Sequence, residues 1–481
     1  MLGSIIAERM KSFYMGKLYP LVICALIFAG HVLGIEVFLL PVIVLIASVS
    51  FWVCDSIRPV FVPLCTFLFA FSSENSLFGT VSSDYYVTGW RIVVFVLLIF
   101  WVFISLCRFF ARQRFLFKLF TRKTPLLFPL LILSVAFMLN GIKSGKWVGG
   151  NMVYAFFQVV AFLFVYVLFY HGFSDDEGAD ELSSYFAYVT MLISLLLIGE
   201  MLNLLLTTPG IIENGVIIKA KIVFGWGVCN NAGSYISVLI PMNFYGAYRS
   251  KHPIWYGLVG VATYLAAILT LSRNALLCST LAFFCCFITI CIIGKRRVMF
   301  RFLFLGVMIS AAIVSLTYHE VISLALENYS SQGFSDSGRI DIWYNALRHF
   351  LEAPIFGNGF HAGLETGTQT AGFIPAMAHN TPIQLLYSMG IVGFLAYFFY
   401  RARSLKAFLV NPSMMKSMMG ASMLVLLVGG LLDNFVFHIQ PIFYYSVAMA
   451  IVYRSVKEEW SFSPILKESS SKWQISAYNR K

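Results

Sequence analysis

A histidine just before a hydrophobic segment is the strongest candidate for chemistry in this sequence. His379 lies in the run AHNTPIQ at residues 378–384. Thr381 and Gln384 have the spacing of a capping box and Pro382 takes the favoured first helical position, so a helix is expected to begin here. The free N–H groups and positive dipole end of a helix N-terminus attract anions. His379 could therefore act as a base beside a bound phosphate, or be an ordinary polar loop residue.

Arg273 is the first of two arginines that could hold such an anion. It lies in the run LSRNA at residues 271–275, between two apolar segments with almost no loop between them. This predicts a position at headgroup level, at the tip of a helical hairpin. A guanidinium there can bind a phosphate through two parallel hydrogen bonds. It can equally anchor the helix by reaching toward the headgroups, and the residue alone leaves both interpretations open.

The second arginine, Arg339, begins a predicted amphipathic helix. Asp336 or Ser337 can cap this helix, and Pro354 ends it. Apolar side chains recur at helical spacing on one face, at Ile340, Trp343, Leu347 and Phe350. Such a helix is expected to lie on the membrane or on a helix bundle.

The composition defines the kind of protein that must position these residues. Of 481 residues, 59% are hydrophobic and only 12% are charged, whereas soluble domains carry about 25% charged residues. With a mean hydropathy of +0.81, a soluble globular protein, a disordered chain and a secreted disulfide scaffold are excluded. The net charge of +12 fits basic cytoplasmic loops rather than binding to nucleic acid. The sequence therefore predicts an all-α polytopic membrane protein.

Apolar stretches long enough to cross a bilayer, about 20 residues each, number fourteen in this interpretation. They are 18–34, 35–54, 57–72, 90–108, 125–141, 150–171, 182–207, 229–248, 254–271, 274–294, 299–318, 381–400, 414–432 and 438–454. With the N-terminus cytoplasmic, this arrangement places 26 of the 34 Lys and Arg on the inner side and 8 on the outer side. That bias is what the positive-inside rule demands.

The predicted organisation has five parts. Residues 1–228 hold about seven N-terminal spans, and 229–318 hold the central spans with the Ser272-Arg273 hairpin. One large extracytoplasmic loop, containing short helices, covers 319–380. The C-terminal spans occupy 381–454, and 455–481 form a cytoplasmic tail. Both termini are thus expected in the cytoplasm, and His379, Arg273 and Arg339 on the extracytoplasmic face of the cytoplasmic membrane.

Acidic residues on the predicted outer side offer no obvious metal site. They include no Asp-x-Asp pair of the kind expected in a nucleotide-sugar enzyme. Glu36, in the first outer loop, is an alternative base, although a lone loop glutamate is usually solvated. Glu200 stands inside an apolar run, toward the outer third of its span.

The ordered motifs of the C-terminal half resemble the signature region of the O-antigen ligase and O-antigen polymerase superfamily. The resemblance covers about residues 225–400 and includes Leu271-Ser272-Arg273 and a segment with Gly225-Trp226-Gly227 and Asn230-Asn231-Ala232. The remaining motifs are Gly338-Arg339, Trp343, Ala346-Leu347, residues 354–359 with Gly357 and Gly359, residues 378–380, Gln384 and residues 390–393.

Membership of that superfamily would imply a GT-C-like, metal-independent glycosyltransferase without a cofactor. Its donor would be a polyprenyl-diphosphate-linked glycan, and its acceptor a sugar hydroxyl at the outer face of the membrane. By motif, His379 would be the catalytic base, and Arg273 and Arg339 would hold the diphosphate. A further basic residue usually precedes the asparagine-rich segment, where only Lys219 and Lys221 are found. Asn380, Trp343, Gly357 and Gly359 would support the site.

Other functions remain open at this point. Polymerisation of O-antigen, capsule or exopolysaccharide repeat units is weakly favoured, because fourteen predicted spans are more than the roughly twelve expected for a ligase of this superfamily. A ligase that transfers the glycan to lipid A-core or another acceptor is the first alternative. A transporter or flippase for lipid-linked sugars is the second, for which Glu200 would be the mid-membrane ionisable residue. A membrane sensor or scaffold would need no fixed group of outer basic residues and a histidine.

Overall fold

The computed structural model describes residues 2–70, 89–142, 149–213, 216–224, 227–294, 296–317, 323, 339–362 and 378–461. Three of the sequence-based expectations lie outside these residues. They are the capping of a helix by Asp336 or Ser337, the Gly225-Trp226 part of the upstream segment, and the cytoplasmic tail beyond residue 461. Of the large loop, the structure describes residue 323, residues 339–362 and residues 378–380.

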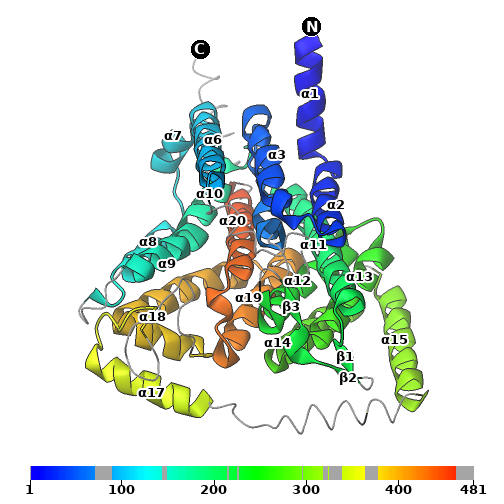
Figure 1. Ribbon diagram of the computed structural model, residues 1–481. Helices are drawn as coiled ribbons and strands as arrows, with labels where there is room; N and C mark the ends of the chain where they lie inside the picture. The colour runs from blue at the N-terminus through cyan, green and yellow to red at the C-terminus, as the bar shows by residue number, and fades with distance from the viewer. Residues whose placement is uncertain are drawn as a thin grey trace, which may run out of the picture.

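Helices account for nearly all regular structure in the described residues (Figure 1). The first nine α-helices are α1 (Leu2–Met15), α2 (Leu18–Leu33), α3 (Leu39–Val53), α4 (Phe61–Thr66), α6 (Arg91–Arg112), α7 (Phe115–Thr121), α8 (Leu127–Met138), α9 (Gly149–Val159) and α10 (Val165–Gly172). The others are α11 (Ala179–Thr207), α12 (Cys229–Arg249), α13 (Pro253–Leu269), α14 (Arg273–Ile293), α15 (Arg297–Thr317), α17 (Arg339–Glu352), α18 (Thr381–Leu409), α19 (Met414–Leu432) and α20 (Ile439–Ser461).

Shorter pieces connect these helices. The 3-10 turns are η1 (Glu36–Phe38), η2 (Arg58–Val60), η3 (Phe67–Ala70), η6 (Lys219–Lys221) and η7 (Phe435–Phe437). A π-helical turn, η5 (Val160–Phe164), joins α9 to α10. Two small antiparallel hairpins fill the connection between α11 and α12, one of β1 (Ile212–Glu213) with β2 (Val216–Ile217) and one of β3 (Val223–Phe224) with β4 (Gly227–Val228).

Helix α12 is the centre of the bundle. It packs against α11, α13, α14 and α19, and every residue from Ala232 to Ala247 is buried. Because other helices surround α12, its polar side chains can find hydrogen-bond partners on those helices, and α12 therefore contains buried polar residues. Asn243, for example, donates from Nδ2 to Ser194 Oγ at 2.8 Å, because a buried amide without a partner is costly.

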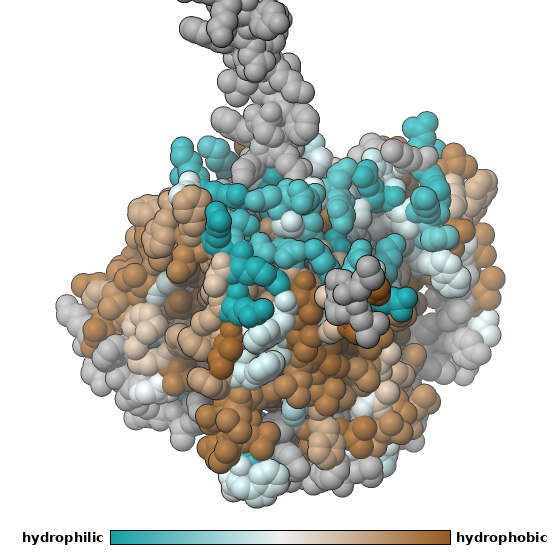
Figure 2. All heavy atoms as spheres, turned by 90° about the horizontal axis from the view of Figure 1, so that it is seen from above, coloured by the Kyte–Doolittle hydropathy of each residue, from teal (hydrophilic) through white to brown (hydrophobic). Residues whose placement is uncertain are grey.

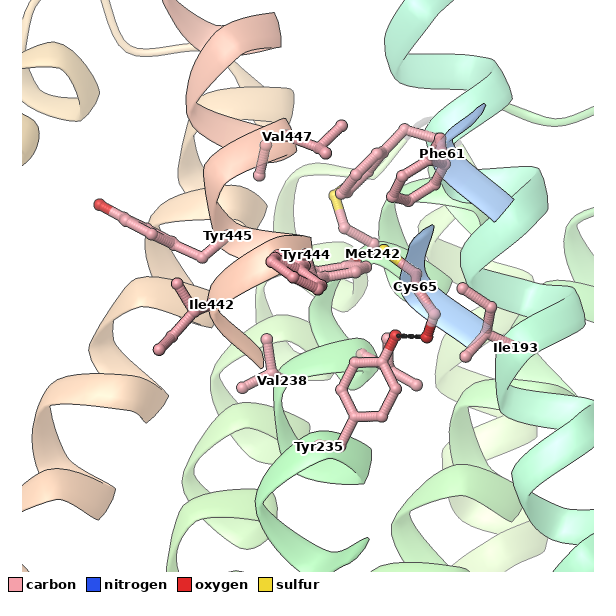
Figure 3. Packing of buried hydrophobic residues seen from close by; sticks show 14 of the residues in the cluster. Phe61, Cys65, Ile193, Tyr235, Val238, Met242, Ile442, Tyr444, Tyr445 and Val447 are labelled. Atoms are coloured by element: carbon pink, nitrogen blue, oxygen red, sulfur yellow. Dashed lines mark hydrogen bonds between the residues drawn. The ribbon is translucent and has the colours of Figure 1, made fainter. Parts of the chain in front are cut away.

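Large aromatic side chains fill the space between α4, α11, α12 and α20 (Figure 3). Phe61 stacks on Phe186 with 4.7 Å between ring centroids, and Tyr444 lies 4.7 Å from the same ring. The Tyr235 hydroxyl donates to the Cys65 carbonyl at 3.0 Å. Burial of such rings supplies a large part of the packing energy, and the hydroxyl finds a partner as buried tyrosines usually do.

Fourteen spans are not confirmed. Among the described helices, six are long and apolar enough to cross a membrane, and the bent pair of α1 and α2 would raise the number to seven. Three further expected spans appear as apolar helices of intermediate length, α3, α8 and α13. The expected span at 57–72 is wrong as a single helix. Its described part is divided into η2, α4 and η3, with Pro59 and Pro63 removing backbone donors.

The two ends of the bundle differ in composition. Helix α1 and the end of α20 lie at the upper end in Figure 1, and α17 lies at the lower end. Figure 2 shows that hydrophilic residues gather on the upper end, while apolar residues form the flanks. Contacts to Glu177 bring the two chain ends together. Arg454 of α20 donates to the Glu177 carbonyl, and Arg58, which follows the first three helices, pairs with the Glu177 carboxylate. The first and last helices therefore reach one end of the molecule.

Candidate active site

The C-terminal end of α19 is the point where the predicted site residues meet. The last carbonyls of a helix have no partner within the helix and need donors from elsewhere. Arg339 Nη1 donates to the Leu432 carbonyl at 2.5 Å, and Asn380 Nδ2 donates to the Leu431 carbonyl at 2.9 Å. Two candidates from distant parts of the sequence are thereby fixed to consecutive carbonyls.

The Arg273 hairpin reaches the same helix end through its neighbour. Asn274 is buried and donates from Nδ2 to the Gly429 carbonyl at 2.8 Å. Ser272 caps α14, its hydroxyl accepting from the Ala275 N–H at 3.4 Å. Arg273 is the first residue of that helix and is itself exposed. The guanidinium thus starts from a backbone position that is tied to α19.

His379 lies within hydrogen-bond distance of a buried carboxylate at this end. Its Nδ1 lies 3.0 Å from Asp433 Oδ1, and Asp433 follows directly after α19. The Asp433 side chain is 5% exposed, whereas that of His379 is 35% exposed. The imidazole is therefore held on one edge and accessible on the other.

The electrostatics determine which nitrogen carries the proton. Burial alone would raise the pKa of Asp433, but the hydrogen bond from His379 and the nearby His438 lower it below its usual value. An ionised carboxylate can only accept hydrogen bonds, so His379 Nδ1 is the donor. Nε2 of the neutral imidazole is then left as a proton acceptor.

The backbone of His379 is in an unusual conformation. Its φ is +51°, in the left-handed region that non-glycine residues rarely adopt. Bonds on both sides hold it there, since Trp343 Nε1 donates to the Ala378 carbonyl at 2.8 Å and Asn380 caps α18. Strain of this kind, on the order of 1–3 kcal/mol, persists only where the surroundings impose it.

The helix cap is shifted by one residue from the expected capping box. Asn380, not Thr381, is the N-cap of α18, and its Oδ1 accepts from the Ile383 N–H at 3.0 Å. Thr381 is helical, and its hydroxyl lies 3.5 Å from the Asp433 carbonyl. Gln384 Oε1 accepts from the Ala378 N–H at 2.6 Å instead of closing a capping box. Asn380 is the better cap because its backbone is extended, with φ −158° and ψ 114°.

The supporting glycines shape the loop that precedes the site. Gly390 interrupts α18 with φ +65° and ψ −165°, and the turn after α17 fits against the break. Asn358 N–H donates to the Tyr387 carbonyl at 2.8 Å, and Gly359 N–H donates to the Ser388 carbonyl at 3.0 Å. A Cβ on Gly357, which also has a positive φ, would lie 2.3 Å from the Ser388 backbone. The glycines therefore allow two backbones to pair.

Helix α17 ends before Pro354 as expected, but it packs through a different face. Ala346 is fully buried in a small cluster with Tyr387, and Ile342 packs against the same cluster. The expected stripe is only partly packed: Trp343 and Phe350 are half-buried, whereas Ile340 is 61% and Leu347 41% exposed. Side chains as small as Ala346 allow α17 to approach α18 closely, while the larger apolar residues stay on the outside.

The two lysine candidates differ in position. Lys221 Nζ binds the Gly210 carbonyl at 2.8 Å and Glu213 at 3.2 Å within the hairpin region. Lys219 and Asp433 both act electrostatically on the Cys229 thiol at the start of α12. Lys219 therefore lies on the side of the site, whereas Lys221 is engaged in holding its own loop.

Asp433 and His438 are the residues that sequence reasoning missed. His438 is placed by Ser234, whose Oγ lies 2.9 Å from His438 Nδ1, and its charge acts on Asp433. The available signal was a lone carboxylate directly after a span whose outer end should lie beside His379. Distance along the sequence hid it, because 54 residues separate the two partners.

The arrangement is suited to proton transfer beside an anion. A carboxylate orients an imidazole, and Arg339 is held at the same helix end. Arg273 adjoins Asn274, which binds the Gly429 carbonyl of the same helix. Within the described ranges, no three His, Cys, Asp or Glu side chains are grouped so as to hold a metal ion.

Comparison with known proteins agrees with this region. No curated protein matches the chain. The family model described as O-Antigen ligase matches residues 258–398, which run from α13 to α18 and contain Arg273, Arg339 and His379. Asp433, Lys219 and Lys221 lie outside the matched segment. The chain is thus similar to O-antigen ligases over residues 258–398, and its described helices include six that are long and apolar enough to cross a membrane.

Proposed function

We propose that this chain transfers a glycan from a polyprenyl-diphosphate donor to an acceptor sugar hydroxyl at the extracytoplasmic face of the membrane. The observation that carries the proposal is the hydrogen bond from His379 Nδ1 to the buried Asp433, with the imidazole partly exposed. A base fixed in this way has one free nitrogen, and it stands beside arginines that can bind a diphosphate.

The reaction would proceed without metal or cofactor. The acceptor hydroxyl gives its proton to His379 Nε2, and its oxygen forms a bond to the anomeric carbon of the donor. The bond from that carbon to the diphosphate breaks, and the electron pair leaves with the polyprenyl diphosphate. Negative charge that develops on the leaving oxygens is stabilised by preorganised cations, for which Arg339 and Arg273 are the candidates and Lys219 a further one.

Joining repeat units into a polymer is the form of this reaction that we favour, with transfer to lipid A-core or another acceptor as the alternative. In either form the enzyme would have a GT-C-like bundle. The membrane-bound donor would carry its diphosphate at headgroup depth, so anchoring in the bilayer would supply part of the positioning.

A reconstituted assay tests this proposal. Purified protein in right-side-out vesicles receives a polyprenyl-diphosphate oligosaccharide and an acceptor added from outside. Lengthened lipid-linked glycan indicates a polymerase, and glycan on a different acceptor indicates a ligase. Everted vesicles, in which the external acceptor meets the other face, should give no product. Movement of donor across the bilayer without a new glycosidic bond would contradict the proposal and favour a flippase.

A flippase is less well supported by the described contacts. Glu200, its best candidate, forms a buried ion pair with His31 at 3.1 Å. The His31 ring also lies against the Phe69 carbonyl. These contacts join α2, η3 and α11, so Glu200 and His31 stabilise the packing of these three elements.

A further inference from the structure

A cavity lies at the end of the bundle opposite to the candidate active site. It has a volume of about 510 Å³ and opens where α1 bends into α2, beside η2, the start of α11 and the loop between α12 and α13. Helix α12 joins the two ends, from Cys229 near the active site to Arg249 at this cavity. At 1.5 Å per residue its 21 residues separate the two sites by about 30 Å.

The charged residues that line the cavity are mostly cations. Lys17, Arg58, Arg249 and Lys251 contribute four fixed positive charges, and Glu181 is the one carboxylate in the lining. Outside the lining, Arg249 pairs with Asp180, 2.7 Å from Nη2. The two lysines are exposed, and in the described part of the chain neither forms an ion pair. Positive charge therefore remains in excess at the cavity.

Arg58 forms the buried wall of the cavity and is only 8% exposed. Its Nη1 pairs with Glu181 at 2.5 Å and Glu177 at 3.2 Å, its Nη2 donates to the Met15 carbonyl, and its plane lies over the Tyr185 ring. Its Nε–H has no hydrogen-bond partner in the described residues. A buried donor without a partner is unfavourable, and this one belongs to a residue that lines the cavity.

The other walls are partly apolar, with Met15, Ala187 and Tyr256 among the lining residues. The positive-inside rule predicts that this end faces the cytoplasm, because it carries the basic residues. Basic pockets between helices at that face bind the headgroups of acidic phospholipids. We propose that this cavity binds the phosphate headgroup of an anionic phospholipid of the cytoplasmic leaflet. This proposal does not depend on the catalytic role of His379.

Lipid binding to the delipidated, detergent-purified protein tests the proposal. Native mass spectrometry measures the binding of phosphatidylglycerol and of phosphatidylcholine with the same acyl chains. The wild type should bind phosphatidylglycerol at least about tenfold more tightly. Each lysine near the membrane surface is expected to increase the affinity for an anionic lipid about fivefold. Lys17→Gln/Lys251→Gln, which alters exposed side chains only, should reduce this preference to about threefold or less.

A matched control removes two lysines that do not line the cavity. Lys123→Gln/Lys406→Gln also alters exposed positions, and it should keep the full preference for phosphatidylglycerol. Equal binding of both lipids by the wild type would overturn the proposal. So would an equal loss in the two double variants, which would show general attraction to a basic protein. If millimolar inorganic phosphate binds and phosphatidylglycerol does not, the ligand is a soluble phosphate and the lipid proposal is wrong.

Discussion

The two ends of the helical bundle use charge in different ways. At the end that holds α1, carboxylates pair with basic side chains, as in Lys11 with Asp55, Arg122 with Asp175 and Arg249 with Asp180. At the α19 end, the buried Asp433 pairs with a histidine, and Arg339 donates to a backbone carbonyl. In the described residues no carboxylate pairs with Arg339.

This difference separates structural from chemical use of charge. Pairing of surface ions joins neighbouring loops and adds little energy, typically 0–1 kcal/mol for each pair. A guanidinium held by a carbonyl keeps most of its charge for a ligand, and an imidazole held by a carboxylate keeps one nitrogen for a proton. Substitutions at the α19 end should therefore alter catalysis more than folding, and those at the opposite end should alter mainly stability.

The largest effect is expected at His379. His379→Gln can still form hydrogen bonds but cannot accept a proton, so turnover should fall by about 10²–10⁴-fold while donor binding changes little. His349→Gln is the matched control, because His349 pairs with Glu352 on α17 and lies in the same loop. The turnover number and the KM for the donor are measured for both variants in the reconstituted assay. Near-normal turnover of His379→Gln would assign the proton to another base, with Glu36 the next to test.

A smaller but diagnostic effect is expected for Asp433→Asn. The Asn Oδ1 can still accept the Asn434 N–H, a bond of 2.8 Å in the wild type, so the turn should survive. In the wild type the same Oδ1 also lies 3.0 Å from His379 Nδ1, so the Asn Oδ1 can keep accepting from the imidazole. The negative charge that stabilises the imidazolium formed during proton transfer is lost. We expect kcat to fall, by less than the roughly 10⁴-fold of an Asp→Asn change that also selects the wrong tautomer, with KM nearly unchanged.

The pH profile tests the same pair. Because the pKa of Asp433 lies below its usual value, the carboxylate stays ionised well into the acid range. Asp433 should therefore add no ionisation of its own to the loss of wild-type activity toward acid. Two ionisations on the acid limb of kcat/KM would contradict this assignment.

The arginine substitutions should have the next largest effect. Arg339→Lys keeps the charge and can reach the Leu432 carbonyl, but it loses the planar fork that fits a diphosphate. Activity should fall by about 10–100-fold, the cost of one lost hydrogen bond to a charged group, and Arg273→Lys should behave in the same way. Arg348→Lys, exposed on the same helix as Arg339, is the control. Normal kcat/KM in both variants would favour the interpretation of these arginines as structural anchors.

Local chemistry explains which parts of the site were predictable from sequence. His379, Arg339 and the helix ending before Pro354 were found because their signals lie within a few residues. The cap was misplaced by one residue, because the choice of Asn380 over Thr381 depends on the position of Asp433 and Leu431, which belong to another helix. The partner of His379 was missed for the same reason.

Hydropathy alone was a poor guide to the extent of the helices in the N-terminal region. The segment 57–72 is apolar enough for a span, yet prolines divide it, and the resulting short pieces pack inside the bundle through residues such as Phe61 and Cys65. Polarity misleads in the other direction for α12, where Asn243 is buried with a partner. Apolar composition indicates burial, but it does not distinguish lipid from protein as the surroundings.

The smallest effect is expected for the ion pair of Arg122 and Asp175 at the opposite end. Nη1 and Nη2 of Arg122 contact the two carboxylate oxygens at 2.7 and 3.0 Å, and this hydrogen bonding lowers the pKa of Asp175 to about 2. A depressed folded-state pKa contributes stability above the unfolded value, near 4, that is lost as the pH falls toward 2. Because the Asp175 side chain is 55% exposed, solvent screening limits the contribution to about 1 kcal/mol or less.

Asp175→Asn should thus lower the thermal midpoint slightly at pH 7, and the difference should shrink below pH 4. Asp176→Asn, next in the chain and exposed, should change neither. A constant difference across this pH range would show that Asp175 acts through packing or backbone contacts, and glycan transfer should remain at the wild-type level in both variants.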